Sequence, residues 1–477
     1  MNLIWQKFTL SYLPLKEYLN TSYLHGSLVG LLRSWRQTSI LLQWGDIIAA
    51  ALVSLVLVLA PFTVNNTTLL GLLLAACAAF WLLLTLSDEV TSSNTLLVTP
   101  IHLLVLLYWG VSVVATALSP EKMAALKGLI NFTLYLLLFA LCARILKSPR
   151  IRSYLLVLYL HVSLFVSIYG VRQKIFGAAQ LATWVDPESP LSKNTRVYSY
   201  LSNPNLLAGY LLPAVILSLV AVFAWQGWQR KALAVTMFVV NMACFRFADS
   251  RGGFIGLAIA LIFLVLLLRY WYGQYLPRFW RIWLVPMLLG CFLAVFVVMF
   301  GVSETFRLRI TSIFAGREDS SNNFRMNVWT AVFNMIHDYP IFGIGPGHDV
   351  FNKIYPLYQL PRYNALSAYS ILLEVAVETG LIGLASFLWF LIVTFNTGWL
   401  QLQRFRQLNS VNGLWLIGAI AALAGMLGHG FVDTVWYRPA VNSIWWLLVA
   451  LVASYWIPLA QDQTRQVNSP NPEPTAN

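Results

Sequence analysis

Charged residues are scarce in this sequence. They make up 10% of its 477 residues, whereas 59% of the residues are hydrophobic. Soluble domains carry about 25% charged residues, so this composition excludes an ordinary cytosolic enzyme. The apolar runs recur along the whole chain with no soluble block between them. We therefore expect a single membrane domain rather than several soluble ones.

Acidic residues are scarcer than basic ones, 18 against 31, which leaves a net charge of +13. A basic chain often binds nucleic acid, but here the Lys and Arg residues lie in short stretches between apolar runs. That pattern orients membrane proteins, so no nucleic-acid partner is expected. Cysteine is also rare, and free cysteine in apolar runs behaves as a small hydrophobe. We predict no disulfide framework, no metal site and no cofactor. The four cysteines, all in apolar runs, are Cys77, Cys142, Cys244 and Cys291.

Long apolar runs are abundant, and a transmembrane helix needs about twenty such residues. The chain is therefore predicted to be an all-α polytopic membrane protein with about twelve transmembrane helices. Almost nothing separates the seventh run from the eighth, which predicts a tight hairpin around Asp249, Ser250 and Arg251. The twelve expected spans are 42–61, 68–86, 97–118, 129–146, 154–171, 206–225, 232–249, 251–270, 282–302, 373–396, 413–432 and 443–460.

Three regions follow from these runs. Residues 42–460 form the predicted transmembrane domain. Residues 1–41 mix aromatic, aliphatic and basic residues without a compact signal-peptide core, and are expected to form an amphipathic segment on the cytoplasmic membrane surface. Residues 461–477 are polar and rich in proline, which predicts a disordered cytoplasmic tail.

The distribution of Lys and Arg among the short loops favours both termini on the inside. An inside loop at Asp88 and Glu89, which carries no positive charge, is the exception. Two long loops, 172–205 and 303–372, then lie outside. The second is too long for a simple connection, and loops of that length are usually functional or disordered. Its stretch Asn327–Asp338 has apolar residues at helical spacing, so we expect an ordered loop with an amphipathic helix on the outer membrane face.

Charged residues at membrane depth are costly and require a reason. Arg246, Asp249 and Arg251 cluster at the expected outer end of the hairpin. One interpretation is a local ion pair that orients the hairpin. The other is that Arg251 points into an outward-facing cavity and binds an anion, because its planar fork suits phosphate or carboxylate.

Two further pairs of residues are four apart and should share a helix face. His429 and Asp433 in the eleventh run form either a proton relay or a structural hydrogen-bonded pair. Glu374 and Glu378 open the tenth run. Two like charges at this spacing are mildly destabilising unless a cation answers them.

Four stretches resemble the O-antigen ligase and polymerase superfamily. They are RVYSYLSNPNLLAG (196–209), DSRGG (249–253), RMNVWTAVFNMIHDYPIFGIGPG (325–347) and VETGLIG (377–383). Their order extends the resemblance over about residues 190–460. Ligases of that family transfer a glycan from an undecaprenyl-diphosphate carrier at the outer face of the bacterial inner membrane. The resemblance implies that Arg251 and Arg325 hold the diphosphate, and we add Arg196 and Arg246 to the predicted anion-binding set.

The resemblance departs from the ligases at one position. They carry an essential histidine eleven residues before the first glycine of the Gly-x-x-Gly motif, where this chain has Tyr369. Tyrosine, with a pKa of about 10, is a poor general base at neutral pH. His337 and His348 lie in the same loop but do not match the motif. The stretch YNALSAYSILLEVAVETG (363–380) resembles the IctB-type branch of the superfamily, whose members are described as inorganic-carbon (bicarbonate) transporters.

Two hypotheses of different class follow. The first is an IctB-type protein for inorganic-carbon accumulation, which the missing histidine favours slightly. The alternative is a glycan transferase or polymerase that acts on undecaprenyl-diphosphate-linked sugars, which the long ordered loop favours. The expected partners are membrane lipid and either an anionic small molecule or a lipid diphosphate. A groove beside Arg251 and Arg325 that opens toward lipid would favour the transferase, and a narrow path across the membrane would favour the transporter.

Overall fold

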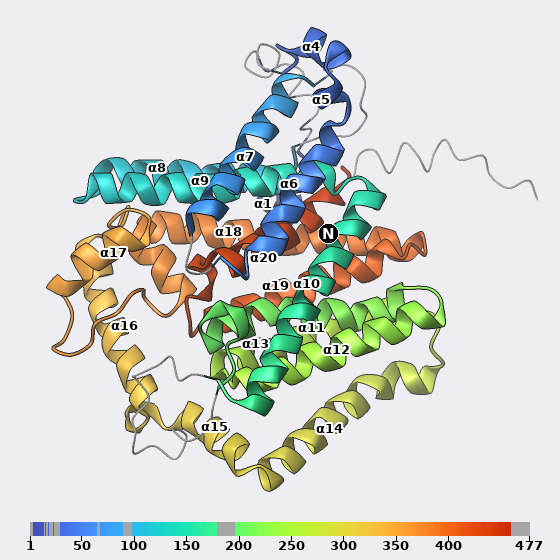
Figure 1. Cartoon of the computed structure of the whole chain (residues 1–477), viewed down its shortest axis with the longest axis vertical. Helices are drawn as coiled ribbons and strands as arrows, with labels where there is room; N and C mark the ends of the chain where they lie inside the picture. Colours follow the sequence, from blue (N-terminus) through green and yellow to red (C-terminus); the bar gives the residue numbers. More distant parts are fainter. Residues whose placement is uncertain are drawn as a thin grey trace, which may run out of the picture.

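The computed structural model describes residues 3–13, 15, 18, 22, 29–63, 67–88, 98–178 and 196–458. The predicted tail at 461–477 lies outside the described residues, as does much of the predicted outer loop 172–205. Every secondary-structure element in the described part is a helix, and most of the long helices pack around a common core (Figure 1).

The predicted all-α polytopic architecture is confirmed. Ten described helices are long and apolar enough to cross a membrane, and two shorter apolar helices match the remaining predicted spans. The twelve helices are α6 (Gly45–Leu59), α7 (Thr67–Leu86), α8 (Pro100–Leu118), α9 (Lys122–Ile145), α10 (Pro149–Phe176), α11 (Pro204–Ala224), α12 (Trp228–Ala248), α13 (Arg251–Tyr272), α14 (Arg278–Val302), α18 (Ile371–Gln407), α19 (Asn412–Gly430) and α20 (Pro439–Ser454).

The core is centred on α11 and α19, which are the most buried of the long helices. Helix α19 packs closely on α13 and α11. Small residues permit this approach: a Cβ added at Gly256 in α13 would lie 2.5 Å from the carbonyl oxygen of Gly425 in α19. Close helix contact through small residues is typical of membrane bundles, where van der Waals packing supplies much of the association.

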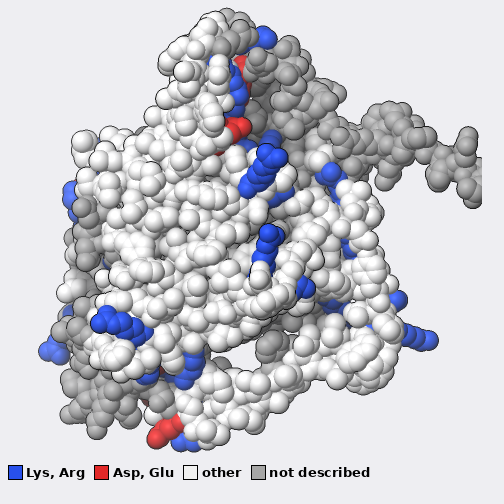
Figure 2. Space-filling view, turned by 45° about the vertical axis from the view of Figure 1, so that its right-hand side comes forward, with Lys and Arg blue, Asp and Glu red and all other residues white. Residues whose placement is uncertain are grey.

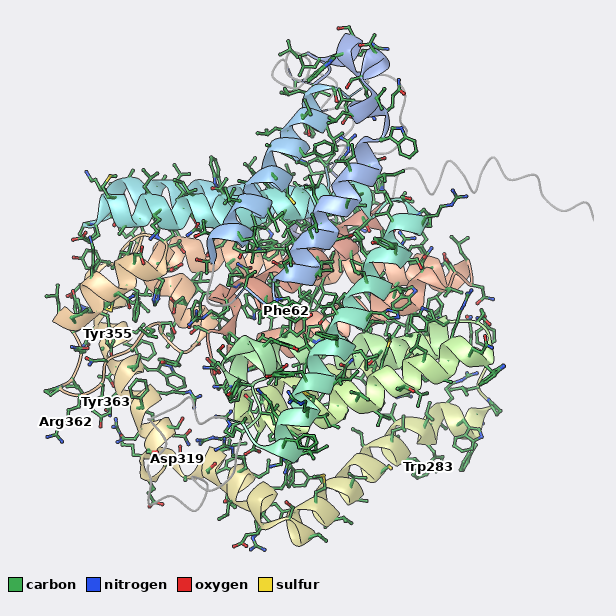
Figure 3. The ribbon with its side chains drawn as sticks, in the orientation of Figure 1. Phe62, Trp283, Asp319, Tyr355, Arg362 and Tyr363 are labelled. Atoms are coloured by element: carbon green, nitrogen blue, oxygen red, sulfur yellow. The ribbon has the colours of Figure 1, made fainter. Side chains whose placement is uncertain are left out.

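Helix α14 stands apart from this core as an arm (Figure 1). Only 6% of the residues in its most apolar stretch are buried by the rest of the chain. Trp283, marked in Figure 3, is half exposed. The space-filling view shows a surface that is mostly uncharged, with Lys and Arg side chains standing singly on it (Figure 2). A helix that is apolar on all sides and unburied by protein is matched to a lipid environment.

The long segment 303–372 is ordered, as predicted. It contains α15 (Glu304–Phe314), η2 (Gly316–Glu318), α16 (Ser320–Asp338), α17 (His348–Ile354) and η3 (Tyr355–Leu357). The predicted amphipathic helix is the second half of α16. Its apolar face was expected to lie on the membrane, but it is buried instead in a small protein core with residues of α9, α17 and α18. We call the end of the bundle that carries these helices the loop end.

Helix α18 is interrupted at Gly380, whose φ of 68° and ψ of −171° are not helical. The chain segment that follows α16 fills the interruption with its own backbone. Four backbone hydrogen bonds cross the gap: Ile344 N–H to Val377 O (2.8 Å), Gly345 N–H to Glu378 O (3.0 Å), Leu381 N–H to Pro340 O (2.8 Å) and Ile382 N–H to Ile341 O (3.4 Å). An interrupted helix is tolerated in a membrane protein where other protein groups satisfy the freed backbone, as they do here.

The acidic exception in the charge count has a structural explanation. Asp88 accepts hydrogen bonds of 2.6 Å from Arg36, in α4 (Arg33–Thr38), and from Arg144 at the end of α9. Two arginines from other elements therefore supply the positive charge that the loop itself lacks.

The N-terminal helix α1 (Leu3–Phe8) packs along α18. Trp5 Nε1 donates to Asn396 Oδ1 at 3.0 Å, and Trp389 Nε1 donates to the Phe8 carbonyl at 2.8 Å. These contacts reach the middle of α18 rather than its end. The position of this segment relative to the membrane surface stays a prediction.

Candidate functional site

The turn between α12 and α13 builds one side of the site. Asp249 adopts a left-handed conformation with φ 51°, and the Ser250 hydroxyl caps α13 by accepting the Gly253 N–H at 3.2 Å. The turn is tight, but the predicted helical hairpin is not formed. Beyond it the two helices separate, because α12 packs on α10 and α11 whereas α13 packs on α19. The turn therefore joins two layers and places Arg251 at the loop end.

Asp249 is held by two arginines. Arg246 lies 3.2 Å and Arg309 3.1 Å from its carboxylate, and Arg309 also donates to the Asp249 carbonyl at 2.9 Å. The local ion pair that the sequence suggested is therefore present between Arg246 and Asp249. Burial lowers the pKa of Arg309 and the Asp249 carboxylate opposes this shift. Arg309 belongs to α15, and nothing in the spacing of the sequence marked it.

Arg251 ties α13 to the start of α16. Its Nη1 donates to Asp319 Oδ1 at 2.8 Å and to Asn322 Oδ1 at 3.1 Å. Asp319 is also the N-cap of α16, where it accepts the Asn322 N–H at 2.9 Å. Figure 3 marks Asp319 at this junction. Arg251 is thus committed in part to protein partners.

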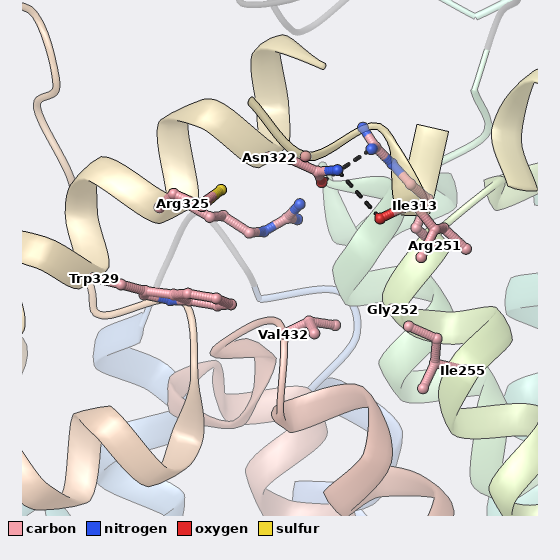
Figure 4. Close-up of a pocket in the computed structure, with 10 residues that line it drawn as sticks. Arg251, Gly252, Ile255, Ile313, Asn322, Arg325, Trp329 and Val432 are labelled. Atoms are coloured by element: carbon pink, nitrogen blue, oxygen red, sulfur yellow. Dashed lines mark hydrogen bonds between the residues drawn. The ribbon is translucent and has the colours of Figure 1, made fainter. Parts of the chain in front are cut away.

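A cavity of about 220 Å³ lies between α13, η2 and α16. Arg251 and Arg325, which the resemblance brought together across seventy-four residues of sequence, both line it. Figure 4 shows the Arg325 guanidinium pointing into the space between Asn322, Trp329 and Val432. Most of the other lining residues are apolar or glycine. The lining comprises Arg251, Gly252, Ile255, Ile313, Gly316, Asn322, Arg325, Met326, Trp329 and Val432.

Arg325 is less engaged than Arg251. Its Nη1 donates to the Ser321 hydroxyl at 3.1 Å, and its Nη2 lies 3.8 Å from Asp433 Oδ2. Its buried Nε has no partner among the described residues. A guanidinium carries five donors, so the protein contacts of Arg325 leave part of its hydrogen-bonding capacity unused.

Arg196 does not line the cavity, but it holds residues that contact the site. It donates to the Ala248 carbonyl at 3.1 Å and to Asn205 Oδ1 at 2.8 Å. Asn205 in turn donates to Asp433 Oδ2 at 2.8 Å. Burial lowers the pKa of Arg196 to about 9, and the nearby Arg309 contributes to this shift. Arg246, which is paired with Asp249, is likewise absent from the lining.

The predicted common helix face of His429 and Asp433 is wrong. Helix α19 ends at Gly430, so Asp433 lies in the following loop. His429 is fully buried, and neither of its ring nitrogens has a hydrogen-bond partner among the described residues. Its ring packs against Gly252, where an added Cβ would come within 2.7 Å of it. The direct hydrogen bond that a relay or structural pair requires is not formed.

Tyr369 precedes α18 in a left-handed conformation with φ 50°, and its ring meets that of Phe324 edge-on. Burial, followed by the nearby Asp433, raises the pKa of Tyr369 above its ordinary value. The hydroxyl therefore stays protonated at neutral pH. Neither alternative histidine of the loop lines the cavity: His337 is exposed beside Asp338, and His348 contacts Asn352.

Glu374 and Glu378 accept hydrogen bonds from backbone amides. The sequence had suggested that a cation would offset their charges. The Ala368 N–H donates to Glu374 Oε2 at 2.6 Å, and the Gly347 N–H donates to Glu378 Oε1 at 2.8 Å. Each carboxylate thus fastens part of the long loop segment to the start of α18, which fixes the position of α16 above the bundle.

Residues 232–388 match the family model described as O-antigen ligase. The match runs from α12 to the first half of α18 and includes every cavity residue except Val432. It supports the O-antigen ligase superfamily. No curated protein matches the chain. The comparison does not reach the level of a branch, so the IctB-type assignment stays a prediction.

Proposed function

We propose that this protein binds a lipid-linked diphosphate glycan at the cavity between α13 and α16 and transfers the glycan to an acceptor. The observation that carries the proposal is the joint lining of one cavity by Arg251 and Arg325. In this account the loop end faces the outside of the bacterial inner membrane, both termini lie inside, and the polyprenyl tail remains in the lipid.

The chemistry of the lining supports an amphiphilic substrate. Two guanidinium groups suit a diphosphate because their forked donors match its oxygens and stay charged at any physiological pH. The neighbouring Ile255, Ile313 and Trp329 are apolar and suit a hydrocarbon chain. Bicarbonate is small and strongly hydrated, and burying it beside such residues would cost much of its solvation. This lining reverses the slight preference for inorganic carbon that Tyr369 gave.

The arginines would act on the leaving group. Transfer breaks the bond between the sugar anomeric carbon and the diphosphate oxygen, and negative charge develops on that oxygen. Donors already aimed at this position stabilise the charge without reorganising, and such stabilisation commonly contributes more to catalysis than any other effect. Arg325 is suited to this role because its Nε has no protein partner among the described residues and its Nη2 has only the 3.8 Å contact with Asp433.

Thermal stability of the purified protein in detergent tests the proposal. We expect undecaprenyl diphosphate to raise the melting temperature, and undecaprenol, which has the same tail without the anion, to leave it unchanged. Arg325→Ala should abolish the shift. Arg307→Ala removes an exposed arginine on α15 and should keep it. Stabilisation by bicarbonate, with no response to the lipid diphosphate, would instead support inorganic-carbon handling.

A further inference from the structure

The carboxylates around the site differ in how firmly arginines hold them. Asp249 has two arginines within 3.2 Å, and Asp319 has Arg251 at 2.8 Å. Asp433 has only Arg325, at 3.8 Å, among the described residues. Hydrogen bonds from nitrogen to oxygen measure about 2.7–3.2 Å, so the Arg325–Asp433 contact at 3.8 Å is too long to be one, whereas the other contacts are not. Among these three, Asp433 is the carboxylate that an arginine does not neutralise at close range.

Asp433 does not itself line the cavity, but two of its neighbours do. Its chain neighbour Val432 and its distant partner Arg325 both line the space. Its Oδ2 accepts one hydrogen bond from Asn205, and its Oδ1 accepts one from the Thr434 N–H at 2.8 Å. A carboxylate offers about four acceptor positions, so two hydrogen bonds orient Asp433 without saturating it.

We propose that Asp433 is the general base that accepts the proton of the acceptor hydroxyl during glycan transfer. This inference rests on the function proposed above. As the hydroxyl oxygen forms its bond to the anomeric carbon, its proton passes to an oxygen of Asp433. The bond from that carbon to the diphosphate oxygen breaks, and the electron pair leaves with the diphosphate. No further reactant is needed.

The neighbours of Asp433 suit this role. A diphosphate bound to Arg325 draws the guanidinium charge toward itself, which leaves the Asp433 carboxylate more basic. Asn205, fixed by Arg196, is a positioning residue that keeps Oδ2 directed. The neutral hydroxyl of Tyr369 does not compete for the proton. The ionisable groups that face Asp433 are Arg196, Arg325, Tyr369, His429 and Tyr437.

The test is an in vitro transfer assay on the full chain in proteoliposomes, with an undecaprenyl-diphosphate-linked glycan as donor. Asp433→Asn should lower the turnover at least about 100-fold, since general-base catalysis typically contributes 10²–10⁴-fold. It should bind undecaprenyl diphosphate as tightly as the wild type or more tightly. Asp433→Glu should recover part of the turnover. Asp349→Asn, an exposed loop-end carboxylate paired with Lys127, is the matched control.

A second variant keeps the inference testable if Asp433→Asn does not fold. Asn205→Ala removes the orienting donor and should lower turnover without changing the KM for the donor, and should shift the acid limb of the pH profile. The inference is overturned if Asp433→Asn transfers at the wild-type rate, or if it loses lipid binding together with turnover. If the wild-type protein does not bind undecaprenyl diphosphate, the proposed function itself is wrong. The binding measurement detects this outcome separately from the transfer assay.

Discussion

Arg251 and Arg325 line one cavity with different commitments. Arg251 is bound to Asp319 and Asn322 and so carries part of the junction between α13 and α16. Arg325 donates one hydrogen bond, to the Ser321 hydroxyl, and its Nε has no partner among the described residues. Replacing the first should therefore damage structure and binding together, whereas replacing the second should damage binding alone.

Arg251→Ala leaves Asp319 without its cation, with only 15% of the Asp319 side chain exposed. Breaking such a pair costs about 3–5 kcal/mol, so we expect a large fall in thermal stability as well as lost binding.

Arg325→Ala should change the stability by no more than about 1 kcal/mol, since Asp433 keeps its other donors. It should weaken lipid-diphosphate binding by about 10- to 150-fold, because each charge-assisted contact contributes about 1.5–3 kcal/mol. Melting curves and titrations separate the two effects, and an Arg325→Ala protein with wild-type affinity would contradict them.

Tyr369→Phe tests the position where the ligases carry histidine. Because burial raises the pKa of Tyr369, the hydroxyl stays neutral and contributes only hydrogen bonding and packing. We expect a stability loss of about 0.5–1.5 kcal/mol and a pH profile of transfer that follows the wild type through neutral pH. Loss of the basic limb, or of all transfer, in a folded Tyr369→Phe protein would show that the hydroxyl takes part in the chemistry.

The sequence marked part of the site. Arg251 and Arg325 were predicted because burying an arginine at membrane depth is energetically costly and because both lie in stretches that resemble the family pattern. Asn205 and Arg309 were missed, since their importance arises from contacts across more than fifty residues of sequence. Asp433 was noticed for its spacing from His429, yet its partners are Asn205, Thr434 and Arg325.

At the scale of elements, the interruption of α18 couples the bundle to the loop end. The backbone hydrogen bonds between the segment after α16 and the interruption of α18 fix the position of α16, and with it Arg325, relative to the core. The interruption depends on a positive φ at Gly380, which side chains with a Cβ rarely adopt.

Gly380→Ala should displace the loop from α18. The added Cβ would lie 2.1 Å from the Ile341 carbonyl oxygen, so the backbone must shift. We expect a destabilisation of more than about 1 kcal/mol, together with weaker binding of lipid diphosphate. Gly71→Ala in α7 is the matched control: nothing lies within 4 Å of its Cβ, and it should be neutral or stabilising by up to about 1 kcal/mol. Equal melting temperatures for the two variants would argue against the coupling.

Hydropathy was sufficient to locate the twelve apolar helices, because lipid demands long apolar runs whatever the tertiary packing. It did not reveal the break at Gly380 or the end of α19 at Gly430. Both lie inside apolar stretches, and hydropathy carries no information on backbone dihedrals. The apolar residues Phe431 and Val432 prolong the run after the helix has ended.

For the whole molecule, the proposed function requires the loop end to face outside. Asp88, Arg36 and Arg144 at the opposite end would then lie at the cytoplasmic side, in agreement with the charge distribution. The orientation is open to a direct test because two exposed positions lie in segments on opposite sides of the proposed membrane.

Single cysteines replacing Ser320, at the start of α16, and Gln407, at the end of α18, should label differently in a cysteine-free background. We expect a membrane-impermeant maleimide to modify the Ser320→Cys variant in intact cells, and the Gln407→Cys variant only after permeabilisation. Cys291 is the exposed native cysteine among those described and must be removed. The reverse labelling pattern would invert the topology and exclude glycan transfer at an outer face.

The most direct measurement of the central claim is photo-crosslinking with an undecaprenyl diphosphate that carries a photoreactive group next to the diphosphate. Mass spectrometry of the digested protein should place the label on peptides from the start of α13 and from α16, around Gly252–Ile255 and Met326–Trp329. Unlabelled lipid diphosphate should compete for this labelling, bicarbonate should not, and Arg325→Ala should abolish it. Label spread over the exposed surfaces of α6 to α8, or unaffected by the competitor, would contradict the assignment of this cavity to a lipid-linked diphosphate.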